Sequence, residues 1–201
     1  ISGIVEESIV DGPGLRYVLF TQGCPHHCKG CHNPTTHPFD GGRMVSPDWV
    51  FADVRKNPIV RGVTFSGGEP FVQSGKLAPL AERLRAAGYN LTSYTGYLYE
   101  ELLADSRHMP LLRQLDILVD GPFILEEKSL IIRFRGSRNQ RIIYGLSKAL
   151  LRFREGFFYV WKALRGARGH PCWRNWYLYG YTVYAVIRVR RRAAPLVWVT
   201  W

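Results

Sequence analysis

Three of the four cysteines in this 201-residue chain lie close together on one short stretch, residues 22–34, which we name the cysteine loop. Cys24, Cys28 and Cys31 follow the spacing C-x-x-x-C-x-x-C. Thiolates select soft metal centres such as zinc and iron–sulfur clusters over hard cations. Three thiolates leave one iron of a four-iron cluster without a protein ligand, much as a catalytic metal keeps one position open. The spacing therefore predicts a metal or cluster site with an open position.

The elements that must position this loop are strands and helices in alternation. Four apolar runs read as strands, and each ends in a polar or glycine-rich turn. They cover residues 16–21, 62–66, 89–94 and 115–119. Helical patterns separate them: Ser46 is a candidate N-cap, and apolar residues between Leu77 and Ala87 recur at helical spacing up to a C-cap at Gly88.

This alternation predicts an α/β fold of parallel βαβ units, in the form of a small or incomplete barrel. In parallel barrels the carboxyl ends of the strands form one rim, and the active-site residues lie there. We therefore expect four motifs to face the same rim. They are the cysteine loop, Gly67-Gly68-Glu69-Pro70, Thr95-Gly96-Tyr97 and Asp120-Gly121-Pro122-Phe123.

Charge and tryptophan content divide the chain into two parts. Residues 1–145 contain 16 Lys and Arg against 15 Asp and Glu, a net charge of +1. Residues 146–201 contain 11 Lys and Arg against the single acid Glu155, a net charge of +10, and five of the six tryptophans. We expect one domain over 1–145 and an atypical basic, aromatic C-terminal extension over 146–201. Our leading hypothesis for the extension is non-native coding, such as translation past a frame shift, which would leave it poorly ordered or loosely packed.

The first domain has a net charge close to zero, so we expect no nucleic-acid partner for it. No stretch reaches the ~20 consecutive apolar residues that span a bilayer, and the N-terminus lacks the basic-then-apolar plan of a secretory signal. We therefore expect a cytoplasmic protein without a membrane partner. Crowded cysteines in a reducing compartment favour metal or redox chemistry over a disulfide framework.

Several motifs resemble those of the radical S-adenosylmethionine (SAM) enzymes, and within them the activases that install a glycyl radical on a partner protein. The cysteine loop, with its trailing His32-Asn33-Pro34, and the run from Ser66 to Pro70 carry this resemblance. Further runs look like those of the activases that serve anaerobic ribonucleoside-triphosphate reductase. They are Asp11-Gly12-Pro13-Gly14, Thr95-Gly96-Tyr97, Val119 to Phe123 and Arg135 to Gln140.

The resemblance implies a [4Fe–4S] cluster whose protein ligands, and hence catalytic residues, are Cys24, Cys28 and Cys31. SAM would chelate the fourth iron through its amino and carboxylate groups, and one electron from the cluster would release methionine and a 5′-deoxyadenosyl radical. This radical would abstract a hydrogen atom from a glycine of the reductase's glycyl-radical subunit. A one-electron donor such as flavodoxin or ferredoxin is a further implied partner.

The resemblance also assigns residues to the SAM site. The backbone at Gly30 and His32, which flank the last ligand Cys31, would lie along the adenine. Gly67 and Gly68 would let the backbone approach the methionyl group, because glycine has no Cβ.

Other polar residues have two readings each. Glu69 would either accept a hydrogen bond from the SAM ammonium or cap the segment that follows it. Asp120 would contact a cation or ribose at the rim, or form the turn after its strand. A basic strand and loop would either dock an acidic partner surface or present a solvated edge that discourages strand pairing. Its arginines are Arg133, Arg135, Arg138 and Arg141.

Two other functions are alternatives. The nearer one is an activase for another glycyl-radical enzyme such as pyruvate formate-lyase, against which the short chain and the runs 120–123 and 135–140 weigh. The more distant one is a zinc-stabilised nucleic-acid-binding module, in which the cysteines and one of His26, His27 or His32 would form a Cys₃His site. A zinc site does not explain a Gly-Gly-Glu-Pro run at another strand end, and we expect His26 and His27 to be solvated loop residues.

Overall fold

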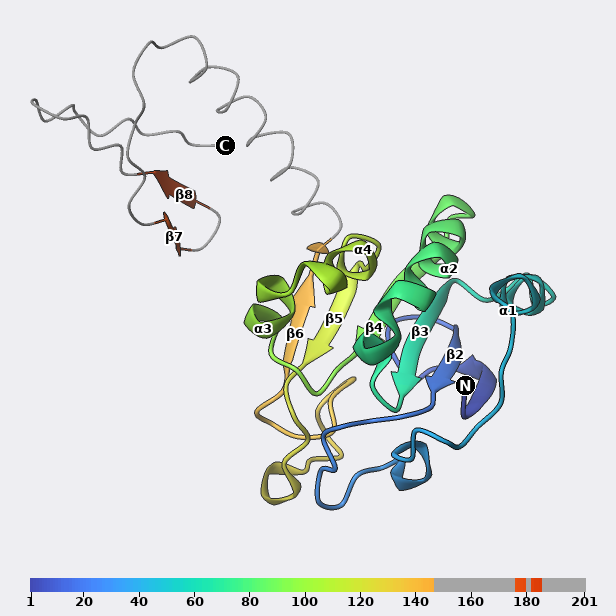
Figure 1. The fold of residues 1–201 in the computed structure, drawn as a ribbon, viewed down its shortest axis with the longest axis horizontal. Helices are drawn as coiled ribbons and strands as arrows, with labels where there is room; N and C mark the ends of the chain where they lie inside the picture. Colours follow the sequence, from blue (N-terminus) through green and yellow to red (C-terminus); the bar gives the residue numbers. More distant parts are fainter. Residues whose placement is uncertain (147–175, 180–181, 186–201) are drawn as a thin grey trace, which may run out of the picture. The chain divides into compact units, whose positions relative to one another are not determined.

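The computed structural model describes residues 1–146, 176–179 and 182–185. The chain divides into two compact units, Ile1–Arg154 and Glu155–Trp201. The first unit contains the cysteine loop and the strands expected from the sequence (Figure 1). The boundary near residue 145 stays a prediction, and the hypothesis of a non-native extension falls almost entirely outside the described residues.

A six-stranded sheet in the order β1-β2-β3-β4-β5-β6 forms the centre of the first unit. Its strands are β1 (Gly3–Ser8), β2 (Arg16–Thr21), β3 (Gly62–Gly67), β4 (Asn90–Tyr94), β5 (Ile117–Asp120) and β6 (Arg141–Tyr144). Strands β2 to β5 run parallel to one another, which confirms the predicted α/β organisation. The two edge strands, β1 and β6, pair antiparallel to their neighbours.

The antiparallel edges correct the expectation of parallel strands throughout. Residues 9–15 alone connect β1 to β2. A connection this short joins antiparallel strands, because a parallel crossover needs about a dozen residues or more. The strand expected among the four arginines begins only at Arg141, and an isolated bridge pairs Lys128 with Ser137 in the segment before it. Of the predicted basic strand and loop, β6 is the strand, and Arg133, Arg135 and Arg138 lie in the loop before it.

Short helices connect the strands. They are α1 (Pro47–Val54), α2 (Ser74–Ala86), α3 (Tyr99–Ala104) and α4 (Met109–Leu112), with 3₁₀ turns η1 (Pro34–Thr36), η2 (Pro70–Gln73), η3 (Ser106–His108) and η4 (Leu125–Glu127). The predicted caps are confirmed. The Ser46 hydroxyl accepts a 3.1 Å hydrogen bond from the Trp49 amide at the start of α1, and Gly88 follows α2 with a φ of +89°.

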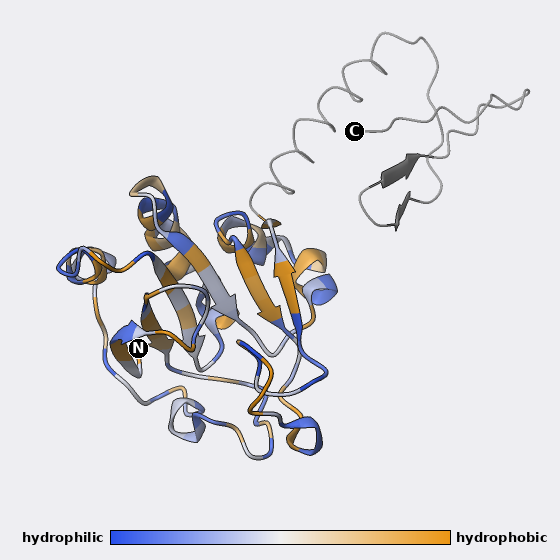
Figure 2. Cartoon of the chain, turned by 180° about the vertical axis from the view of Figure 1, so that it is seen from behind, coloured by the Kyte–Doolittle hydropathy of each residue, from blue (hydrophilic) through white to orange (hydrophobic). Residues whose placement is uncertain are grey.

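Apolar side chains of β3, β4 and α2 form the centre of the core. Val63 and Phe65 of β3 belong to one buried cluster with Leu91 of β4 and with Leu80 and Leu84 of α2. Burying such a side chain stabilises the folded state by roughly 1.5–3 kcal/mol. Figure 2 shows that β5 and β6 are also largely hydrophobic. The sheet and the helices therefore hold the strand ends in fixed positions.

Arg16, at the start of β2, has a fully buried side chain whose hydrogen-bond acceptors within residues 1–146 are all neutral. They are Thr64 Oγ1 at 2.6 Å, Val63 O at 2.8 Å, Asn90 Oδ1 and O at 3.0 Å each, and Pro13 O at 3.1 Å. Burial lowers the pKa of Arg16 to about 10, so the guanidinium is still protonated at neutral pH. This one side chain ties the β1–β2 loop to β3 and β4.

We expect Arg16→Met to lower the free energy of unfolding by about 3 kcal/mol, because several buried acceptors would lose their donor together and each costs roughly 1–3 kcal/mol. Urea denaturation measures this change. Arg61→Met is the matched control, since Arg61 is exposed and its contact with Pro58 O is 3.4 Å long. The control should shift stability by no more than about 0.5 kcal/mol. Equal stability of the two variants would contradict the role given to Arg16.

The carboxyl ends of the four parallel strands lie at one end of the sheet (Figure 1). The cysteine loop follows β2, and Gly67 ends β3 with Gly68 directly after it. Thr95 follows β4, and Gly121 follows β5. The four motifs expected on one rim therefore meet there.

The second unit is described only where two strands pair. Strands β7 (Trp176–Tyr179) and β8 (Thr182–Ala185) run antiparallel, with Trp176 opposite Ala185 and Tyr179 opposite Thr182. Among the described residues of both units, no helix has the length and apolar character needed to cross a membrane.

Candidate functional site

A cavity of about 780 Å³ opens at the carboxyl ends of the parallel strands. The three loop cysteines line it, together with His32, Gly67, Gly68, Thr95, Gly96, Gly121 and Phe123. Residues 9–11 and 129–136 line it as well. Small-molecule sites in proteins occupy roughly 300–1,000 Å³. The cavity is therefore large enough for a cofactor of ordinary size.

Backbone hydrogen bonds hold the cysteine loop at its two ends. Gly23, with a φ of +93°, turns the chain out of β2, and the Cys24 amide donates to His37 O at 3.0 Å. The Cys31 amide donates to Cys28 O at 3.2 Å, which makes a turn between the last two cysteines. All three cysteines are free; Cys24 is buried, and Cys28 and Cys31 are half-buried.

The surroundings of Cys24 bear on how it would bind a metal. Burial raises the pKa of the Cys24 thiol. A hydrogen bond from the His26 backbone acts in the opposite direction but does not cancel the effect of burial. Because metals bind the thiolate, binding has to displace the proton from this thiol.

The three thiols of the cysteine loop are of the ligand type that iron–sulfur clusters use. Within the described residues, no three His, Cys, Asp or Glu side chains lie close enough together to hold one metal ion. A zinc ion would need its sulfur ligands about 2.3 Å from one point. The three thiols line one shared cavity and would hold a cluster of several irons there.

Gly67 and Gly68 line the cavity and pack closely against the chain around β2. Gly67 has a φ of +90°, and a Cβ there would lie 2.7 Å from Phe20 Cα. A Cβ on Gly68 would lie 2.4 Å from Gly23 O. Both positions require glycine, because backbone atoms cannot move aside as a flexible side chain can. Gly67 therefore approaches the end of β2 and Gly68 the start of the cysteine loop, and contact with a methionyl group stays a prediction.

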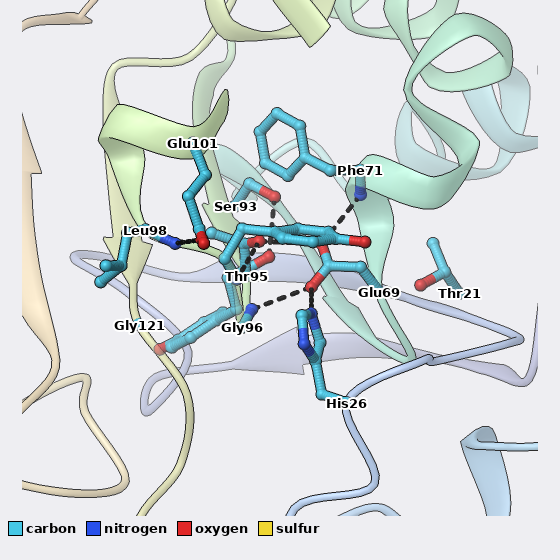
Figure 3. A network of polar contacts seen from close by, with 12 residues as sticks. Thr21, His26, Glu69, Phe71, Ser93, Thr95, Gly96, Leu98, Glu101 and Gly121 are labelled. Carbon is cyan, nitrogen blue, oxygen red and sulfur yellow. Dashed lines mark hydrogen bonds and ion pairs between the residues drawn. The ribbon is translucent and has the colours of Figure 1, made fainter. Parts of the chain in front are cut away.

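Glu69 is fully buried, and each of its carboxylate oxygens accepts two hydrogen bonds (Figure 3). Oε1 accepts from Phe71 N at 3.0 Å and from Thr95 Oγ1 at 2.9 Å, and Oε2 accepts from Gly96 N and from His26 Nε2, both at 2.8 Å. The side chain caps η2, and it is not among the described residues that line the cavity. Of the two readings of Glu69, this geometry favours the cap.

The expectation that His26 is a solvated loop residue is wrong. Its Nε2 lies 2.8 Å from Glu69 Oε2, and its ring stands edge-on to the Tyr97 ring with the centroids 4.5 Å apart. His27, in contrast, is exposed as expected. The partners His26 and Glu69 are 43 residues apart, so no spacing rule points to this pair. The one sequence signal for this contact is that both motifs follow parallel strands and so lie at the same end of the sheet.

The residues predicted along the adenine differ in position. His32 lines the cavity, and its ring lies 4.8 Å from the Phe123 ring. Gly30 is not among the described lining residues, and a Cβ there would lie 2.8 Å from Leu125 Cδ1. Its φ of +71° also favours glycine. Packing and backbone conformation explain Gly30, and its place beside an adenine stays a prediction.

Asp120, at the end of β5, is fully buried and uses both oxygens within the protein. Its Oδ1 accepts from Arg141 Nε at 3.0 Å, and its Oδ2 accepts from Arg141 Nη2 and from the backbone amide at the start of α3. Hydrogen bonds to Asp120 and Glu100 raise the pKa of Arg141. Asp120 and Arg141 therefore join β5 to β6 and α3, whereas Arg133 and Arg135 line the cavity.

Known proteins resemble this chain over the whole of the site. The family described as a 4Fe-4S single cluster domain matches residues 10–143. A relative from Vibrio cholerae serotype O1 is 37% identical over 142 residues, which cover 67% of this chain and 90% of the relative. One from Escherichia coli K12 is 34% identical over 140 residues, covering 66% and 90%. One from Enterobacteria phage T4 is 30% identical over 141 residues, covering 66% and 86%.

All three relatives carry the same name, anaerobic ribonucleoside-triphosphate reductase-activating protein. The matched residues include the three cysteines, Gly67 and Gly68, and the ends of all four parallel strands. The chain therefore belongs to the family of anaerobic ribonucleoside-triphosphate reductase-activating proteins, with a 4Fe-4S single cluster domain.

Proposed function

We propose that this chain is a radical SAM activase that generates a glycyl radical on anaerobic ribonucleoside-triphosphate reductase. The observation that carries the proposal is the shared cavity, which the three cysteines line from the end of β2 and Gly67 and Gly68 line from the end of β3. The names of the relatives support the choice of partner. We further propose that the sheet is an incomplete barrel of the radical SAM type, because its four parallel strands end at this cavity.

The residues of the chain would hold and shield the reactants. Cys24, Cys28 and Cys31 would bind three irons of a [4Fe–4S] cluster and leave the fourth to the amino and carboxylate groups of SAM. When bound, the cluster supplies the electron that cleaves SAM into methionine and a 5′-deoxyadenosyl radical. Phe20 and Phe123 line the same cavity and would exclude water from the reacting groups. Three free thiols suit the reducing cytoplasm, where we place this activity.

An anaerobic radical assay tests the proposal. After reconstitution with iron and sulfide and reduction with dithionite, the protein should convert SAM to 5′-deoxyadenosine. It should also produce a glycyl-radical EPR signal when anaerobic ribonucleotide reductase is added. Reduced flavodoxin or ferredoxin should replace dithionite. Pyruvate formate-lyase, added instead of the reductase, should show no glycyl-radical signal. A signal on pyruvate formate-lyase alone would show that the chain is an activase for another glycyl-radical enzyme.

Elemental analysis of the same preparation provides the control for the distant alternative. The proposal requires about four irons and four sulfides per chain. A zinc-stabilised nucleic-acid-binding module would instead contain zinc without iron or sulfide, and its binding to nucleic acid would weaken steeply with salt.

A further inference from the structure

The Glu69 carboxylate joins three separate parts of the chain beside the cavity. Its donors are Phe71 N of η2, Thr95 Oγ1 and Gly96 N at the end of β4, and His26 Nε2 of the cysteine loop. Figure 3 shows these bonds meeting on one side chain. A carboxylate offers roughly four lone-pair sites and only accepts hydrogen bonds, so His26 is the donor. The acceptor capacity of Glu69 is therefore used within the protein.

The bond from His26 is the one that reaches into the middle of the cysteine loop. Within residues 1–146, it is the only hydrogen bond between residues 25–32 and any segment outside that loop. His26 lies two residues from Cys24 and two residues from Cys28. Among the hydrogen bonds of residues 1–146, this one alone links this part of the loop to the wall at Glu69.

The protein around His26 is shaped to hold its ring. A Cβ on Gly96 would lie 2.4 Å from His26 Cδ2, so a larger residue there would displace the imidazole. The Tyr97 ring closes a second side, edge-on at 4.5 Å. The His26 side chain is only 18% exposed, and that of Glu69 is 1% exposed. This fit distinguishes His26 from a histidine that merely lies on an exposed loop.

From this geometry we infer that His26 and Glu69 are a positioning pair, which sets the spacing between the cysteine loop and the cavity wall at Thr95 and Gly96. The inference rests on the proposed function, in which SAM would bind an iron held by the loop, inside the cavity that Thr95 and Gly96 also line. His26 is not among the described residues that line the cavity, so it acts through the neighbouring Cys24 and Cys28. Losing the pair should therefore weaken SAM binding more than it weakens the fold.

Three variants test the pair: His26→Ala, His26→Gln and the control His27→Asn. The glutamine amide can donate to Glu69 in place of the imidazole Nε2. His27 is an exposed neighbour with a φ of +48°, a conformation that asparagine tolerates. Each protein is reconstituted anaerobically, and its dissociation constant for SAM is measured by equilibrium dialysis with the cluster oxidised, so that SAM is not consumed. Iron content and the thermal unfolding midpoint are measured alongside.

We expect His26→Ala to raise the dissociation constant for SAM by roughly 10-fold or more, the scale on which lost outer-shell hydrogen bonds act at metal sites. Iron content and the unfolding midpoint should stay near those of the unmodified protein. His26→Gln should restore most of the affinity, and His27→Asn should bind SAM normally. A merely structural contact would lower the unfolding midpoint instead and leave the affinity of the folded fraction unchanged.

Two results would overturn the inference alone: His26→Ala binding SAM as tightly as the unmodified protein, or His26→Gln binding as weakly as His26→Ala. An unmodified protein that carries its cluster but binds no SAM would overturn the proposed function and this inference together. If His26→Ala does not fold, the SAM affinities of His26→Gln and His27→Asn are compared instead. Normal SAM affinity in both variants supports the role of the hydrogen bond. Weak SAM binding by His26→Gln contradicts it.

Discussion

Replacing Cys31 with alanine should abolish SAM cleavage. The variant would keep only two of the three thiols that line the cavity. We expect reconstituted iron to fall well below about four per chain and 5′-deoxyadenosine production to fall by roughly 100-fold or more, beyond what outer-shell changes cause. Alanine at Cys24 or Cys28 should have the same effect. Chromatographic measurement of 5′-deoxyadenosine after anaerobic reduction checks the result.

Cys172→Ala is the matched control for this experiment. Cys172 is the fourth cysteine of the chain and lies outside the cysteine loop, so its loss should leave iron content and SAM cleavage unchanged. Unaltered 5′-deoxyadenosine production by the Cys31 variant would refute the assignment of the cluster ligands. Equal losses in the Cys31 and Cys172 variants would show that thiol loss in general, and not the loop, is responsible.

Gly68→Ala should disturb stability and cluster assembly together. The added Cβ would lie 2.4 Å from Gly23 O, a backbone atom just before Cys24, so the β3 end and the cysteine loop would have to separate. Overpacking of this kind costs roughly 1–3 kcal/mol. We therefore expect urea denaturation of the metal-free protein to show a loss in this range. Reconstituted iron should fall as well, because the loop can no longer sit in its present position.

Gly75→Ala provides the contrast. Gly75 lies in α2 and a Cβ there would meet nothing within 4 Å, so alanine should raise stability by about 0.5–1 kcal/mol through its better helix propensity. Iron content should not change. If Gly68→Ala proved as stable and as rich in iron as Gly75→Ala, the tight packing of β3 against the cysteine loop would not matter for the site.

Local patterns were sufficient to predict the parallel centre of the fold and its helix caps. Ser46 and Gly88 signal the ends of helices through their own chemistry, and the apolar runs before the cysteines and before Gly67 mark strands. The meeting of the four motifs followed from one topological rule about strand ends. The spacing of the cysteines was enough to predict that the three thiols share one site, since they are neighbours in the sequence and line one cavity; their role as cluster ligands stays a prediction.

Features that depend on distant partners could not be predicted. Glu69 meets His26 across 43 residues, and Asp120 meets Arg141 across 21, so neither residue's role was visible in its own motif. From their own motifs, Asp120 was expected to form a turn and His26 to be exposed to solvent. Neither expectation included the contacts with Arg141 and Glu69. The antiparallel direction of β6 was not predicted for a related reason, because pairing with β5 fixes it.

The buried guanidinium of Arg16 also bears on the order in which the protein folds. Its hydrogen bonds reach 48 residues along the chain to Thr64 and 74 residues to Asn90. Contacts of such sequence separation form slowly, because the intervening loops must close first. The β1–β2 loop, whose residues 9–11 border the cavity, is bonded to β3 through Thr64 and Asp11, but the Arg16 bonds complete its attachment only when β2, β3 and β4 lie side by side. A nascent chain therefore has to extend beyond β4 before the cavity takes its shape, and cluster insertion has to follow that stage of synthesis.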